Sequence, residues 1–213
     1  MSNEVTFRVF RGEPDADGDP FGRMVDYTVE MDEGMVVLDV IHRIQAEQSP
    51  DLACRWNCKA GKCGSCSAEV NGMPRLMCMT RMDTLPEGAD VTIEPMRAYP
   101  VIKDLVTDVK VNYEIKKRIK PFKPRAPDAE DGTWRMEQSD VERVQEFRKC
   151  IECYLCQNVC HVLRNHDRKD AFVGPRFMIR LASLEMHPLD TEDRIPAIKE
   201  EFGSGLCNIT RCC

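Results

Sequence analysis

Cysteine is the residue type in this sequence with the clearest chemistry. The chain has 213 residues, and 12 of them are cysteine. Its N-terminal stretch, MSNEVTFRVF, lacks the apolar segment of a secretion signal, so we expect the thiols to be reduced. Clustered cysteines in a reducing compartment more often bind metal or carry out redox chemistry than form disulfides. The cysteines therefore predict metal or cluster sites.

The first cysteine set has gaps of four, two and eleven residues between its members. This is the plant-type spacing of four thiolates around a [2Fe–2S] cluster. Gly61 and Gly64 lie where a loop wrapped closely around a cluster needs glycine. A four-cysteine zinc site is the alternative, although zinc sites usually use paired C-x2-C knuckles. Just before the set, Cys54 is predicted to be a buried free thiol. The members of the set are Cys58, Cys63, Cys66 and Cys78.

The second cysteine set, CIECYLCQNVC, has gaps of two, two and three residues. This is the bacterial ferredoxin run, in which three cysteines hold one [4Fe–4S] cluster and the fourth reaches to another cluster. The first three ligands would be Cys150, Cys153 and Cys156, and the fourth cysteine is Cys160.

The C-terminal sequence CNITRCC repeats this run incompletely. Cys207 and Cys213 have the spacing of a first and third ligand, and Thr210 stands where the middle cysteine belongs. Together with Cys160 they supply three thiolates, which suits a [3Fe–4S] cluster. The spacing places the fourth ligand of the [4Fe–4S] cluster just past residue 213, so we expect the natural chain to continue. Cys212 is predicted to be a bystander, and its binding to the [4Fe–4S] cluster remains an alternative.

The elements that must position these cysteines fall into an α+β pattern. In residues 1–100, alternating apolar residues predict strands over 5–11 and 23–31. Apolar residues at helical spacing predict a helix over 35–48. Shorter strands are expected at 67–72, 74–80 and 89–95.

Beyond residue 100 the composition shifts. A helix is predicted over 101–119, and residues 121–132 form a linker rich in proline and charge. From residue 139 the pattern is helical. We therefore expect a ferredoxin-type domain at 1–100, a helix and linker at 101–138, and a helical domain with two clusters at 139–213.

Other functional classes find little support in the sequence. The net charge of −6 argues against a nucleic-acid partner. No apolar run approaches the ~20 residues of a transmembrane helix, so membrane attachment would need a partner. No nucleophile–histidine–acid arrangement and no phosphate-binding glycine loop is evident. We therefore expect no catalytic residue in the chain.

A plant-type half followed by a bacterial-type half with one cysteine lost resembles the iron–sulfur subunit of succinate dehydrogenase and fumarate reductase. The resemblance covers nearly the whole chain, and RWNCKAGKCGSC, RLMCMTR and YPVIKDL resemble the actinobacterial-type variant. It implies a β-grasp fold for the first domain and a bacterial-ferredoxin-like fold for the helical one. It also implies a relay of single electrons through [2Fe–2S], [4Fe–4S] and [3Fe–4S] clusters.

The resemblance further implies a flavoprotein partner with FAD that oxidises succinate, and a membrane anchor where quinone is reduced. The chain would lie on the cytoplasmic face of the bacterial plasma membrane, as a peripheral subunit. His161 and Arg164 would lie near the quinone or a lipid phosphate, although structural roles are equally expected. The rival interpretations are an electron-transfer subunit of another flavin-linked oxidoreductase and a zinc-stabilised adaptor.

Overall fold

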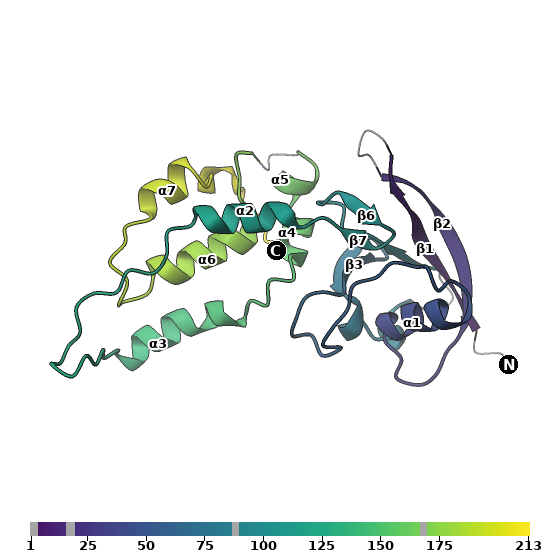
Figure 1. Ribbon diagram of the computed structural model, residues 1–213, viewed down its shortest axis with the longest axis horizontal. Coiled ribbons are helices and arrows are strands. Elements are labelled where there is room, and N and C mark those ends of the chain that lie inside the picture. The colour runs from purple at the N-terminus through teal and green to yellow at the C-terminus, as the bar shows by residue number, and fades with distance from the viewer. Residues whose placement is uncertain (1–3, 16–19, 87–89, 167–169) are drawn as a thin grey trace. The chain divides into compact units, whose positions relative to one another are not determined.

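The computed structural model describes residues 4–15, 20–86, 90–166 and 170–213. It divides into two compact units, shown in Figure 1. The first unit comprises Met1–Val109 and Glu152–Val159, and the second comprises Lys110–Ile151 and Cys160–Cys213. The middle of the bacterial-type cysteine run therefore packs with the N-terminal part of the chain.

The first unit is built on a five-stranded mixed sheet with the order β2-β1-β5-β3-β4. β1 pairs antiparallel with β2 and parallel with β5, whereas β3 is antiparallel to both β5 and β4. The alternation predicted along the first strand is confirmed, because Phe7 and Val9 are fully buried and Arg8 between them is exposed. The strands are β1 (Glu4–Pro14), β2 (Pro20–Glu30), β3 (Ser67–Val70), β4 (Met73–Leu76) and β5 (Val91–Glu94).

Helix α1 (Val37–Glu47) lies against this sheet (Figure 1) and confirms the helix predicted over 35–48. Its start is fixed by the Val36 backbone N–H, which donates to the Asp39 carboxylate at 3.1 Å. The helix buries five apolar residues that join the sheet in one core. They are Val37, Leu38, Val40, Ile41 and Ile44.

The helix predicted over 101–119 is wrong in its first half. The structure forms a hairpin of β6 (Val101–Lys103) and β7 (Val106–Thr107), and helix α2 (Lys110–Arg118) begins only afterwards. The reason is tertiary. Asp104 has a φ of +48° and is 2% exposed, and its carboxylate accepts the backbone N–H groups of Gly12 and Ala53 at 2.9 and 2.8 Å. Arg11 pairs with it at 3.0 Å, so these bonds stabilise a turn that local sequence disfavours.

One further prediction needs adjustment, and another is confirmed. The strand predicted over 74–80 ends at Leu76 and is followed by the 3-10 helices η1 (Met77–Met79) and η2 (Met82–Thr84). The predicted helical start after residue 138 is confirmed by α3 (Gln138–Gln145), which continues as the 3-10 helix η3 (Glu146–Lys149). Within the bacterial-type run lies α4 (Leu155–Val159).

The second unit is helical around a core from α2, α6 and α7. Ile115 of α2, Phe177 and Leu181 of α6, and Phe202 after α7 are all buried there. The class predicted for the whole chain, α+β, is confirmed. The remaining elements are α5 (His161–Arg164), α6 (Pro175–Glu185), α7 (Ile195–Glu200) and η4 (Ser204–Leu206).

The described residues include no helix that is both long enough and apolar enough to cross a bilayer.

Candidate cysteine cluster sites

The four cysteines of the plant-type set come together as two pairs of thiols. Three lie on the loop between α1 and β3, and Cys78 lies on η1 behind β4. The side chains of Cys58 and Cys63 are neighbours, and so are those of Cys66 and Cys78. One pair on each side is the arrangement that a two-iron centre requires, because each iron takes two thiolates.

Backbone N–H groups point at these sulfurs. Ala60 and Lys62 donate to Sγ of Cys58 at 3.4 and 3.3 Å, and Cys78 donates to Sγ of Cys66 at 3.5 Å. Such donors stabilise sulfur that carries negative charge. They are the donors that the glycine-rich loop predicted.

The two sides of the site differ electrostatically. Hydrogen bonds from the Ser65 hydroxyl and from backbone N–H groups lower the pKa of the Cys63 thiol to about 6. Burial, together with the neighbouring Cys78 thiol, raises the pKa of Cys66 to about 11. A buried thiol of this kind becomes a thiolate readily only when a positive centre such as iron compensates the charge. No sequence pattern predicted the role of Ser65.

The donor set fits a two-iron cluster better than a single ion. A zinc site would need four thiols converging on one point. Two thiol pairs with N–H donors to sulfur suit the charge and extent of a [2Fe–2S] cluster instead.

The loop conformation depends on its glycines. Gly61 and Gly64 have φ values of +64° and +71°, in the left-handed region that glycine enters without cost. A Cβ on Gly61 would lie 2.9 Å from the Met79 side chain. Cys54, before the loop, is partly buried against the core, and burial raises its pKa to about 12. Cys54 is thus partly buried where full burial was expected, and its role as a free thiol remains a prediction.

The bacterial-type run is divided between the two units. Cys153 and Cys156 belong to the first unit, whereas Cys150 and Cys160 belong to the second. Cys160 is buried, and the other three are partly exposed. The joint binding of one [4Fe–4S] cluster by Cys150, Cys153 and Cys156 remains a prediction.

The three cysteines predicted for the three-iron centre line one pocket of about 250 Å³. Cys160 enters from the start of α5, and Cys207 and Cys213 enter from the C-terminal segment. Cys212 also lines this pocket, with its thiol 3.8 Å from the Thr210 carbonyl oxygen. The structure thus brings the predicted set together in the second unit, and it leaves the role of Cys212 a prediction.

The C-terminal segment repeats the backbone of the ferredoxin run. Cys153 is flanked on both sides by non-glycine residues of positive φ, and Thr210 is flanked in the same way. Such residues are uncommon and persist where surrounding structure demands them, often around a bound anionic group. The backbone therefore places Thr210 in the position of a middle cysteine. The flanking φ values are +56° at Glu152, +61° at Tyr154, +57° at Ile209 and +58° at Arg211.

Of the two residues proposed to lie near quinone, His161 lines the 250 Å³ pocket and Arg164 is not among its described lining residues. Nδ2 of Asn208 lies 2.8 Å from Nε2 of His161, so the ring nitrogen accepts the amide hydrogen. Arg164 is on the same short helix as His161. Sequence patterns did not predict Asn208 as a partner of His161, because the two are 47 residues apart.

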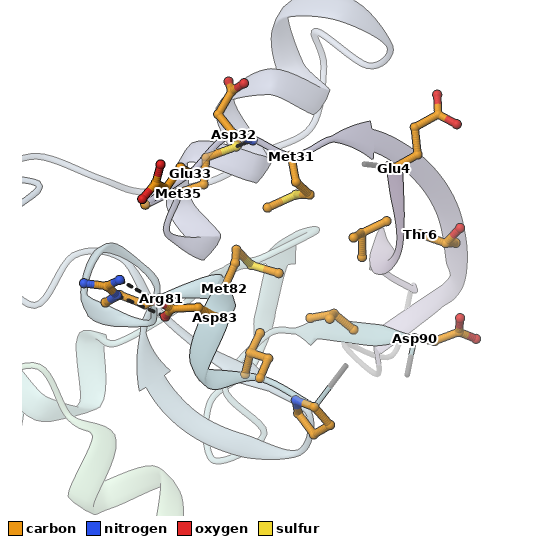
Figure 2. A pocket seen from close by; sticks show the side chains of 15 residues that line it. Glu4, Thr6, Met31, Asp32, Glu33, Met35, Arg81, Met82, Asp83 and Asp90 are labelled. Carbon is orange, nitrogen blue, oxygen red and sulfur yellow. Dashed lines mark hydrogen bonds and ion pairs between the residues drawn. The ribbon is translucent and has the colours of Figure 1, made fainter. Parts of the chain in front are cut away.

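A second hollow, of about 650 Å³, lies on the first unit (Figure 2). Met31, Met35 and Met82 line it together with several carboxylates, among them Glu4 and Asp90. No cysteine or histidine is among the described residues around it. This hollow is therefore distinct from the cysteine sites, and the sequence offered no signal for it.

Comparison with known proteins gives consistent results. Residues 6–114 match the family model of a 2Fe-2S iron-sulfur cluster binding domain. The chain is 30% identical to the fumarate reductase iron-sulfur subunit of Mycobacterium tuberculosis (strain CDC 1551 / Oshkosh), with 100% of this chain and 85% of the relative covered. It is 29% identical to the succinate dehydrogenase iron-sulfur subunit of Paracoccus denitrificans, with 100% and 81% covered.

A solved structure shares the whole fold. The chain superposes on a chain of the Mycobacterium smegmatis Sdh1 complex in the apo form with a TM-score of 0.93 and 59% sequence identity. The match covers 100% of this chain and 87% of the other.

Proposed function

Because the chain belongs to the family of succinate dehydrogenase and fumarate reductase iron–sulfur subunits, we propose that it relays single electrons from a flavoprotein's FAD to quinone. It is a component of an oxidoreductase, and its own part in the reaction is electron transfer. The succinate site and the flavin would belong to the partner, so no catalytic acid, base or nucleophile is assigned here.

The observation that carries this proposal is the pocket lined by Cys160, Cys207 and Cys213. Thr210 takes the backbone position of a middle cysteine, so the pocket would hold a cluster through three thiolates, with Cys212, which also lines it, as a bystander. A three-thiolate centre after a plant-type set is what a relay of two-, four- and three-iron centres requires. A rival subunit with two complete bacterial-type runs would carry cysteine at Thr210.

The assignment of ligands follows from these arrangements. Bound clusters would supply one-electron acceptors whose potentials depend on cluster type, charge and hydrogen bonds to sulfur. The chain's own residues bind and tune them, for example through the N–H groups of Ala60 and Lys62 and the hydroxyl of Ser65. The proposed ligands are Cys58, Cys63, Cys66 and Cys78 for [2Fe–2S], Cys150, Cys153 and Cys156 for [4Fe–4S], and Cys160, Cys207 and Cys213 for [3Fe–4S].

The finer architecture and surroundings belong to the same proposal. The first unit would be a β-grasp ferredoxin domain, supported by its mixed sheet with α1 packed against it. The second would be a bacterial-ferredoxin-like helical domain. The partners would be a flavoprotein and a membrane anchor, with quinone near His161, on the cytoplasmic face of the plasma membrane.

The direct test is the metal content of the purified complex. We expect iron and acid-labile sulfide in the proportions of one two-iron, one four-iron and one three-iron cluster, and a brown protein. Zinc with no sulfide in a colourless protein would contradict the relay and favour the adaptor. Iron in the proportions of two four-iron clusters would contradict the three-thiolate pocket.

A further inference from the structure

A fully buried carboxylate and a fully buried amide meet next to the cysteines of two proposed centres. Glu69 and Asn158 are both 0% exposed, and Nδ2 of Asn158 donates to Oε1 of Glu69 at 2.9 Å. Glu69 is on β3, three residues after Cys66, and Asn158 is on α4, two residues after Cys156. The two side chains are 89 residues apart in sequence, but both belong to the first unit.

Each polar group at this contact has a partner. Oδ1 of Asn158 accepts the backbone N–H of Ala98 at 2.9 Å, so the amide is held at both ends. Oε2 of Glu69 pairs with Nε of Arg97 at 3.1 Å, and Arg97 reaches solvent. An unpaired buried polar group lowers the free energy of unfolding. Two elements that carry paired groups can therefore pack in only one register, because any other register would leave these groups unpaired. An apolar contact would permit small slips that this contact forbids.

A second contact fixes the other end of the same segment. The Ser67 hydroxyl lies 2.9 Å from the carbonyl oxygens of both Gly64 and Cys153 and donates its hydrogen between them. Gly64 approaches Cys153 so closely that an added Cβ would lie 2.6 Å from the Cys153 Cα. Segment 152–159 is therefore held against the plant-type loop and β3 at both of its ends.

We propose that Glu69 and Asn158 are positioning residues that fix the separation between the two-iron and four-iron centres. They do so by locking segment 152–159, with two proposed four-iron ligands, onto the strand that follows the plant-type loop. The inference rests on the proposed relay, because a fixed separation matters only if electrons pass between the two centres. The contacts described for the two residues are with each other, with the Ala98 backbone and with Arg97, so each would act through the backbone that it holds.

The test uses the purified complex with a matched pair of substitutions. Glu69→Leu removes the acceptor at similar volume, whereas Glu69→Gln keeps an oxygen that Asn158 can bond. Glu94→Gln is the control, since Glu94 is the other partner of Arg97, at 3.5 Å, and does not contact Asn158. Two readouts are measured: hydrogen exchange of amides 155–159, and the spin-relaxation enhancement between the reduced two-iron and four-iron centres, which depends steeply on their separation.

For Glu69→Leu we expect exchange to be about tenfold faster, the effect of one lost buried hydrogen bond, together with altered relaxation enhancement at unchanged iron content. Glu94→Gln should match the unmodified complex, and Glu69→Gln should keep the relaxation enhancement through its bond to Asn158 although it loses the ion pair with Arg97. Identical behaviour of Glu69→Leu and Glu69→Gln would overturn the proposal. So would a lower melting temperature or lost iron with unchanged relaxation, because either result would show a purely structural role.

If Glu69→Leu prevents the complex from assembling, a second variant can be used in its place. Asn158→Leu removes the same hydrogen bond from the other side and is expected to give the same two changes. The relay itself is tested separately in the unmodified complex, where cluster signals that ignore succinate would refute the proposed function. A full response to succinate with no effect of either leucine variant would refute the positioning role alone.

Discussion

Thr210 occupies the same local backbone environment as Cys153, since each lies between two non-glycine residues of positive φ. The C-terminal segment thus keeps the conformation of a cysteine run while lacking the middle thiol. On the proposed ligand assignment, the missing thiol at Thr210 is what would make the cluster in the 250 Å³ pocket a three-iron one.

Thr210→Cys should restore a fourth thiolate to this pocket and convert the three-iron centre to a four-iron one. The backbone is already that of a ligating cysteine, so the change needs only a side chain. EPR of the oxidised complex is expected to lose the three-iron signal, and reduction should reveal a second four-iron signal. Thr210→Ser is the control. Retention of the three-iron signal by Thr210→Cys would mean that the residue points away from the cluster.

Cys63 and Cys54 should respond oppositely to substitution. Cys63→Ala removes a thiol whose lowered pKa, about 6, suits a ligand, so the reduced two-iron EPR signal should be lost. Cys54→Ala removes a thiol whose pKa burial raises to about 12, and all clusters should remain. Its cost is expected to be about 1 kcal/mol in unfolding free energy. Loss of the two-iron signal from Cys54→Ala would make Cys54 a ligand.

Gly64 and Gly72 form a matched pair for the close approach to Cys153. Both have φ near +70°, but a Cβ on Gly72 meets nothing within 4 Å. Gly72→Ala should therefore lower the unfolding free energy by about 1–2 kcal/mol, the strain of a left-handed alanine. Gly64→Ala adds a clash with Cys153 and should cost about 1–3 kcal/mol more. Chemical denaturation measures both, and equal costs would contradict the close packing.

Much of the first unit could be predicted from sequence because its signals are local. Alternation along β1 and the helical spacing in α1 reflect which faces those elements bury, and both elements were found near the expected residues. Cysteine spacing is also local. It predicted a set in which Cys58 and Cys63, and Cys66 and Cys78, are neighbours in the structure, and cluster binding by this set remains a prediction.

The parts that sequence missed depend on partners distant along the chain. The hairpin at Val101–Thr107 forms because buried Asp104 bonds Gly12 and Ala53, and its local pattern resembles a helix. The contact between Glu69 and Asn158 has no sequence signature either, since both residue types are common on the surface.

The buried ion pair of Arg194 and Asp190 should be important for the second unit. Both side chains are 1% exposed and lie 3.0 Å apart, and the guanidinium also donates to the carbonyl oxygens of Lys120 and Pro121. Arg194→Leu strands a buried carboxylate and should cost about 3–5 kcal/mol in unfolding free energy. Lys149→Met breaks an exposed pair and should cost under about 1 kcal/mol. Similar melting temperatures for the two variants would contradict this role.

The relay itself is tested most directly by EPR of the purified complex, first as isolated and then after succinate is added. We expect an oxidised three-iron signal that disappears with succinate while a reduced two-iron signal appears. A three-iron signal that persists with succinate would keep the clusters but contradict the succinate link. Absence of any iron signal in both states, with zinc found by elemental analysis, would contradict the account entirely.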